Sequence, residues 1–252
     1  MQYKIGIKQQ YFHHHAYEII HTYTDLKVQI EKTLSGKVEL KLLKRKRKNE
    51  LYDGVTADSL NNEIRNMLQG TVIQENKIMY EVNEENGVFY FSESKSSIGG
   101  FDFAIINHEQ NLISLRNLCF GTLSYADGKN RWKRFLSKNK ELQQIASKLN
   151  IGAEPIGIDL SPISKSTKYT PLILGEIQFG NWALAYRDFF KVLKADVQNS
   201  IDCLIYIVPT GNLESMLSDG IVTFHKTVEI IKDYAKVISV PIWVIGLDVN
   251  IK

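Results

Sequence analysis

The chain has 252 residues, of which 44% are hydrophobic and 23% are charged, and its formal net charge is +3. This composition is ordinary for a globular protein, and the length suffices for one large domain with a complete core. No apolar run approaches the roughly 20 residues of a membrane span, and the N-terminal residues lack the apolar region of a signal peptide. The two cysteines lie in apolar surroundings, so we expect no disulfide framework and a cytoplasmic, reducing location.

The distribution of charge is more informative than its total. Two stretches concentrate cations, as contacts to phosphate groups require. The alternative is that each stretch is a solvated loop or a localisation-like patch. The first stretch contains Lys44, Arg45, Lys46, Arg47 and Lys48, and the second contains Lys129, Arg131, Lys133, Arg134, Lys138 and Lys140.

The first half of the chain predicts two helices followed by a β-rich region. Apolar residues recur at helical spacing over 11–34 and again over 58–69, with Gly36 and Gly70 as stops. The first basic stretch lies between these helices, and we expect it to be a loop after a short strand or helix end at 38–43. Residues 71–116 suggest strands at 77–82, 88–91, 101–106 and 112–115. This region could be an inserted subdomain or an arm on the core. Residues 131–149 predict a basic amphipathic helix.

The second half alternates strands and helices. We predict strands at 156–160, 171–179, 201–209 and 241–247, helices at 182–195, 213–217 and 224–237, and a polar loop at 161–168. The strand at 201–209 is almost wholly apolar, as in a sheet covered on both faces. In the helix at 182–195, Arg187, Lys191 and Lys194 suggest an outer basic stripe. The expected fold class is α/β, with a mixed central sheet flanked by helices on both faces.

A polar pair interrupts the apolar strand at 171–179. Glu176 and Gln178 are two residues apart and therefore point to the same face. Burial of such groups is costly, so we expect them to face a cleft. Asp159 could lie beside Glu176 on a paired strand. Two carboxylates there favour a hard divalent cation such as Mg²⁺, with the Ile177 carbonyl as a further ligand.

Other interpretations of these residues stay open. Asp159 could pair with a surface cation, and Glu176 could close a buried network. Templates for other chemistries are absent: the sequence contains no phosphate-binding Walker loop, no Gly-x-Ser-x-Gly, no Cys-x-x-Cys and no His-Glu-x-x-His.

The stretch EIQFGNW at 176–182, followed by AYRD at 185–188, resembles a known enzyme group. It is similar to the active-site strand and following helix of the BglII, BstYI and BamHI group of type II restriction endonucleases, in the PD-(D/E)xK superfamily. The resemblance covers roughly residues 12–68 and 155–250. Residues 71–150 have no counterpart in it, so we expect them to form an inserted subdomain or arm for DNA recognition, or simply an insertion. The resemblance implies a restriction-endonuclease-like core in which Asp159 and Glu176 are the metal-binding carboxylates. Gln178 falls where the superfamily usually carries Lys, and Asp102, at a strand start, is a rival to Asp159.

The resemblance implies Mg²⁺-dependent hydrolysis of both strands of DNA at a short palindromic site, GATC-centred in the matching branch, by a homodimer. Asp159, Glu176 and the Ile177 carbonyl would hold the metal, and Gln178 would orient a water. The basic stretches would bind flanking phosphates, which gives affinity without sequence discrimination. Two alternatives remain: another metal-dependent nuclease of repair or recombination, and a catalytically silent DNA-binding protein, which the missing Lys makes conceivable.

Overall fold

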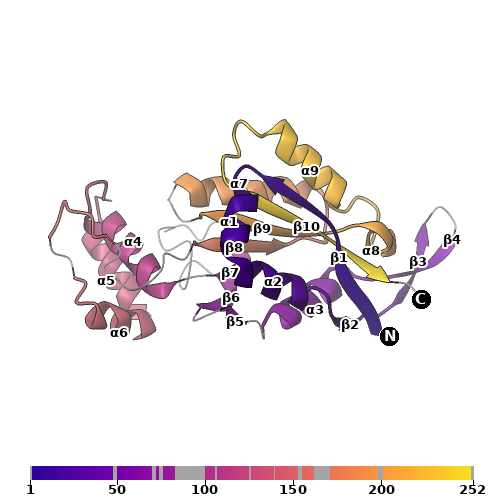
Figure 1. Ribbon diagram of the computed structural model, residues 1–252, viewed down its shortest axis with the longest axis horizontal. Coiled ribbons are helices and arrows are strands. Elements are labelled where there is room, and N and C mark those ends of the chain that lie inside the picture. Colours follow the sequence, from indigo (N-terminus) through magenta and orange to yellow (C-terminus); the bar gives the residue numbers. More distant parts are fainter. Residues whose placement is uncertain are drawn as a thin grey trace.

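One mixed β-sheet organises the chain (Figure 1). The computed structural model describes residues 2–47, 50–69, 72–73, 76–82, 100–105, 107–124, 126–138, 140–152, 155–161, 171–197 and 201–250. The strand order is β2-β1-β10-β9-β8-β7-β6-β5, in which β8, β9 and β10 are mutually parallel and the other pairs are antiparallel. The strands are β1 (Gln2–His13), β2 (Lys37–Glu39), β5 (Val72–Ile73), β6 (Asn76–Val82), β7 (Phe101–Ile105), β8 (Ile173–Ile177), β9 (Cys203–Pro209) and β10 (Ile242–Asn250).

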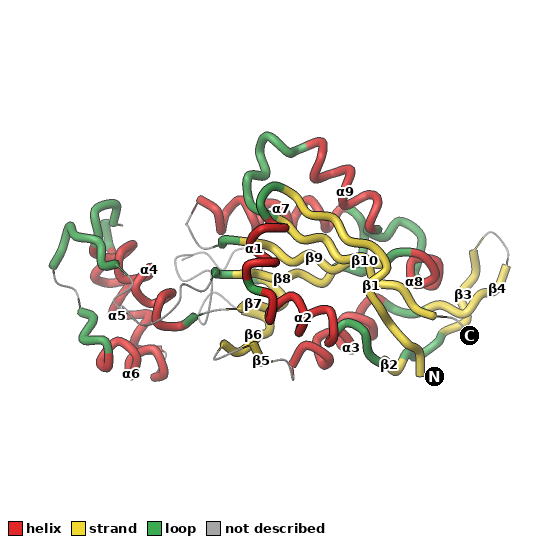
Figure 2. Tube along the Cα trace, viewed as in Figure 1, coloured by secondary structure: helices red, strands yellow, loops and turns green. Residues whose placement is uncertain are grey.

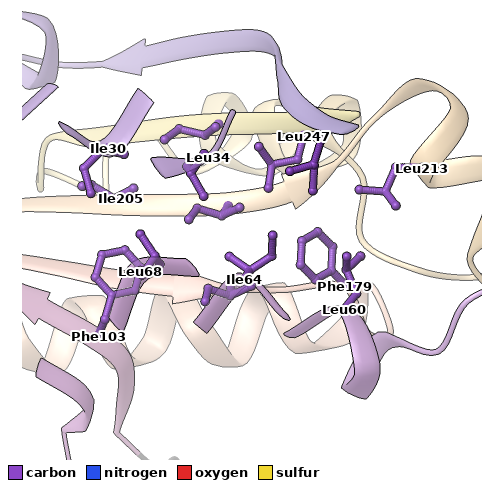
Figure 3. Packing of buried hydrophobic residues seen from close by; sticks show 14 of the residues in the cluster. Ile30, Leu34, Leu60, Ile64, Leu68, Phe103, Phe179, Ile205, Leu213 and Leu247 are labelled. Carbon is purple, nitrogen blue, oxygen red and sulfur yellow. The ribbon is translucent and has the colours of Figure 1, made fainter. Parts of the chain in front are cut away.

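Helices cover both faces of this sheet, which confirms the predicted fold class (Figures 1 and 2). On one face, α1 (Ala16–Thr22), α2 (Thr24–Thr33), α3 (Ala57–Gln69) and α8 (Gly211–Met216) contribute to one apolar cluster. Figure 3 shows part of it, with Ile30, Ile64 and Phe103 converging from two helices and a strand. On the other face, α7 (Ala183–Val197) and α9 (Phe224–Asp233) pack on a second cluster. All residues of β8 and β9 are buried, as expected for strands covered twice.

The N-terminal prediction was partly wrong. Residues 11–13 belong to β1, because they pair with 242–244 of β10, and the rest of the predicted helix divides into α1 and α2 at Tyr23. The first basic stretch is a strand and not a loop. It forms the antiparallel hairpin of β3 (Leu43–Arg47) and β4 (Glu50–Gly54), in which Lys44 faces Asp53. Opposite charges placed across two strands favour this pairing.

A three-helix unit follows β7 and begins within the last part of the region that we predicted as β-rich. It consists of α4 (His108–Phe120), α5 (Gly128–Lys138) and α6 (Lys140–Lys148), and its apolar cluster includes Leu112, Trp132 and Leu142. The strand predicted at 112–115 was wrong, since these residues lie within α4, which the Asn107 side chain caps by accepting hydrogen bonds from two backbone N–H groups. The strands predicted near 77–82 and 101–106 are β6 and β7. The strand predicted at 88–91 lies outside the described residues.

The C-terminal half follows the prediction closely, with one exception. Residues 156–160 form no strand, and 162–168 of the predicted polar loop lie outside the described residues. In Figure 1 the β3–β4 hairpin lies at the end of the molecule where β10 finishes, and the three-helix unit lies at the opposite end. Among the described residues, no helix is both long and apolar enough to cross a bilayer.

Candidate active site

Two carboxylates meet where β7 begins and β8 ends. The antiparallel register pairs Phe103 with Gly175, so Asp102 and Glu176 occupy the next position beyond this pair. The Asp102 Oδ2 atom accepts a hydrogen bond of 2.7 Å from the backbone nitrogen of Ile177. Gly175 permits this close approach, because an added Cβ there would lie 2.0 Å from the Phe103 ring. The strand pairing therefore holds the two carboxylates together.

Asp102 also has a cationic partner. The guanidinium of Arg65, on α3, donates to Asp102 Oδ1, and the Asp102 side chain is 12% exposed. The pair joins α3 to the start of β7. Asp102 is thus held from two sides while part of its carboxylate remains at the surface.

Glu176 is buried, with 5% of its surface exposed. Its Oε1 accepts a hydrogen bond of 2.7 Å from Lys191 Nζ on α7, whereas its Oε2 has no hydrogen-bond partner among the described residues. Burial, and next the negative charge of Asp188, raise the pKa of Glu176 well above its ordinary value, while Lys191 opposes this rise. A buried carboxylate oxygen without a partner is costly, so Oε2 is the atom of Glu176 that is open to a further ligand.

Gln178 points to the same face as Glu176, as predicted, but its amide is engaged in packing. Its Nε2 donates to Asp188 Oδ2 at 2.8 Å, and its Oε1 accepts from the Gly180 nitrogen at 3.0 Å. The hydroxyl of Tyr206 donates to the same Asp188 oxygen at 3.0 Å. Burial, and next the charge of Asp188, raise the pKa of Tyr206 well above its ordinary value, so its proton stays available for this bond. These contacts hold Gln178 against α7.

Sequence reasoning missed Asp188, Lys191 and Tyr206 as parts of this cluster. Lys191 does not belong to an outer stripe: it is 2% exposed and lies 3.3 Å from Asp188. The sequence contains a signal for the burial of these two residues, because Asp188 and Lys191 share helical spacing with Ala185 and Val192, which are buried on the same side of α7.

The structure does not bring Asp159 beside Glu176. The strands next to β8 are β7 and β9, and Asp159 is an exposed residue outside any strand. Its carboxylate accepts hydrogen bonds from the Thr122 nitrogen at 3.0 Å and the Thr122 hydroxyl at 2.8 Å, which lower the pKa of Asp159. The segment around it is fastened to α4, for example through a bond of 2.8 Å from the Leu160 nitrogen to Asn117. The structure therefore holds Asp159 against Thr122, whereas Asp102 is bonded to the residue that follows Glu176.

Residues 8–247 match the family model described as restriction endonuclease BglII/BglIII. The chain belongs to this restriction endonuclease family. The crystal structure of BglII complexed with a DNA 16-mer matches 99% of this chain and 80% of that chain at 13% identity, with a TM-score of 0.52, so the two share a fold. Free BglII matches 99% of this chain and 81% of that one at 13% identity, with a TM-score of 0.43. No curated protein sequence matches the chain.

In this BglII-family chain, the described residues that we predicted to bind phosphates lie on two separate elements, β3 and α5. On β3, Lys44 and Lys46 are exposed, and Lys44 forms an ion pair of 2.7 Å with Asp53. The hairpin is anchored next to α8, where the Val55 nitrogen donates to the Met216 carbonyl at 2.8 Å. Lys48 lies outside the described residues. On α5, Arg131 pairs with Asp127 at 2.6 Å, and Lys133 and Arg134 are exposed.

The carboxylate oxygens of Asp102 and Glu176 are of the kind that binds a hard divalent cation. Among the described residues, no group of three or more His, Cys, Asp or Glu side chains could hold a metal ion. Mg²⁺, however, is usually bound through one or two carboxylates, with waters and substrate phosphates completing its shell. Asp102 and the unpartnered Oε2 of Glu176 provide such a pair.

Proposed function

We propose that this chain is a type II restriction endonuclease that hydrolyses phosphodiester bonds in both strands of DNA at a short palindromic site, with Mg²⁺ as cofactor. One observation carries the proposal. In a chain of the BglII/BglIII restriction endonuclease family, two carboxylates lie on adjacent strands, and an oxygen of the buried one, Glu176 Oε2, has no partner among the described residues.

In this proposal, Asp102, Glu176 and the carbonyl of Ile177 would hold the metal. The bound ion would lower the pKa of a water and stabilise charge developing on the phosphate. Arg65 holds the Asp102 carboxylate in place, since it donates to Oδ1. Gln178 acts by fixing β8 against α7 through Asp188, and not by contact with the substrate.

DNA binding is assigned to the two basic elements. The exposed cations of β3 and α5 would contact backbone phosphates, which supply affinity and register. The three-helix unit, within the predicted insertion at 71–150, would present α5 to the duplex as an arm. The match to a BglII structure solved with DNA supports a DNA-bound state of this fold.

The assembly that suits a palindromic site is a homodimer, because a two-fold protein reads a two-fold site. We propose a cytoplasmic homodimer related to the BstYI and BamHI enzymes as well as to BglII. The resemblance at 176–188 implies that this site is a GATC-centred palindrome.

Digestion of a plasmid with and without Mg²⁺ tests the function. Discrete fragments that appear only with the metal are expected, and sequencing of their ends gives the site and the overhang. A smear would indicate a non-specific nuclease of repair or recombination. An intact plasmid that shifts on a gel would indicate a catalytically silent DNA-binding protein.

A further inference from the structure

A buried lysine contacts both strands that carry the carboxylates. The Nζ atom of Lys191 lies 2.7 Å from Glu176 Oε1, 3.0 Å from the Gly100 carbonyl and 3.3 Å from Asp188 Oδ1. The same atom lies 5.2 Å from the centroid of the Phe101 ring, within the range of a cation–π contact. Lys191 is 2% exposed, so this position is fixed by packing on all sides.

These contacts determine how the Glu176 carboxylate is oriented. Because Lys191 occupies Oε1, the oxygen that remains available is Oε2, which has no partner among the described residues. The contact with the Gly100 carbonyl helps to fix the position of Asp102, since Gly100 directly precedes β7, which begins with Phe101 and Asp102. Lys191 thus connects the end of β8 to the start of β7 at the point where Asp102 and Glu176 meet.

Packing alone explains this lysine poorly. An ion pair in a protein interior costs about as much in lost hydration as it gains, so an apolar side chain of similar size would stabilise the fold equally well. Gln178, which falls where the superfamily named in the resemblance usually carries Lys, provides no charge either, and its amide is bound to Asp188 and Gly180. Lys191 is the cation that contacts Glu176 in the described part of the chain.

We infer that Lys191 is the positioning residue of the metal site: it fixes Glu176 through Oε1 so that Oε2 is presented, beside Asp102, to a divalent cation. This inference rests on the proposed function and assigns a role there to a residue of α7. Lys191 acts through Glu176 and the Gly100 backbone and need not touch the DNA. Outer partners of metal ligands typically contribute about 10- to 100-fold to metal affinity.

The test is the affinity of the full chain for Mn²⁺, measured by electron paramagnetic resonance without DNA and therefore independently of cleavage. We expect Lys191→Gln, which keeps a hydrogen-bond donor but removes the charge, to weaken Mn²⁺ binding by about tenfold or more. The matched control is Arg187→Gln. Arg187 pairs with the same Asp188, at 3.4 Å, but has no contact with Glu176 among the described interactions, and its removal should leave the affinity unchanged.

The outcomes separate this inference from the function on which it rests. If wild-type protein binds Mn²⁺ and folded Lys191→Gln binds it equally well, the role of Lys191 is overturned and the metal site stands. If wild-type protein binds no Mn²⁺, the metal site itself is wrong, and the inference falls with it. If Lys191→Gln fails to fold by circular dichroism, the comparison is made between Asp188→Asn and Asp188→Asn/Lys191→Gln, because the double variant restores the net charge of the cluster.

Discussion

The Asp102 carboxylate is bonded to β8 at the residue that follows Glu176: Oδ2 of Asp102 accepts a hydrogen bond of 2.7 Å from the Ile177 nitrogen. The two acidic groups of the site therefore cannot separate without breaking the pairing of β7 with β8. Arg65, on α3, donates to Oδ1 of Asp102, and Lys191, on α7, donates to Oε1 of Glu176. The two cations come from opposite layers of the fold. A cation between the carboxylates would complete a cluster that is otherwise fixed on each side.

Replacement of Glu176 by Gln should separate cleavage from DNA binding. The amide has nearly the same shape but no negative charge, so we expect the cleavage rate to fall at least about 100-fold, while DNA affinity at low Mg²⁺ is retained. Cleavage assays and gel shifts on the same preparation measure both. Glu229→Gln, an exposed position on α9, is the matched control and should cut normally. Cleavage by Glu176→Gln at the wild-type rate would remove Glu176 from the site.

The basic hairpin should govern the salt dependence of DNA binding. Each phosphate contact contributes about 0.9 to the slope of log affinity against log salt concentration. The double variant Lys44→Ala/Lys46→Ala should therefore lower that slope by about 1.8, and Lys133→Ala/Arg134→Ala on α5 should act similarly. The exposed pair Lys232→Ala/Lys236→Ala provides a control with an unchanged slope. An unchanged slope in either test variant would exclude that element from the DNA interface.

Stability should fall in mild acid because of His13. This side chain is buried at the end of β1 and shares the Ile238 carbonyl with His14, at 3.0 Å from its own Nε2. Burial lowers the pKa of His13 below its ordinary value of 6.5, so the folded protein binds this proton less readily than the unfolded chain. The stabilising contribution of neutral His13 is thus present above pH 6.5 and is lost as the pH falls below that value.

Urea unfolding at pH 7.5 and pH 5.5 measures this effect. The decrease in the free energy of unfolding should be smaller in His13→Gln than in the wild type. The exposed His225→Gln should show the wild-type decrease. Equal decreases in all three proteins would show that His13 does not contribute to the pH dependence.

The sequence predicts some parts of this site well, for physical reasons. Continuous apolar runs indicate β8, β9 and β10, because only strands covered on both faces tolerate such runs. The alternation of side chains places Glu176 and Gln178 on one face without further knowledge. The residue that lies beside Glu176 was harder to predict, since residues 106–172 intervene between β7 and β8 and contain the three-helix unit. Pairing across such an insertion leaves no local signal, and Asp159, nearer in sequence, was chosen instead.

The errors elsewhere have similar causes. The polar residues of β1 obscure its alternation, and its strand conformation depends on pairing with β10, which is remote in sequence. Lys191 was expected at the surface because lysine is rarely buried without a partner. Its partners, Glu176 and the Gly100 carbonyl, come from strands whose proximity only the fold establishes.

The most direct test of the central claim compares two aspartates. Asp102→Asn and Asp159→Asn are similar changes, but only Asp102 lies beside Glu176, whereas Asp159 is bound to Thr122. Mg²⁺-dependent cleavage of DNA should fall at least about 100-fold in Asp102→Asn and remain near the wild-type rate in Asp159→Asn. Full activity of Asp102→Asn together with loss of activity in Asp159→Asn would contradict the account.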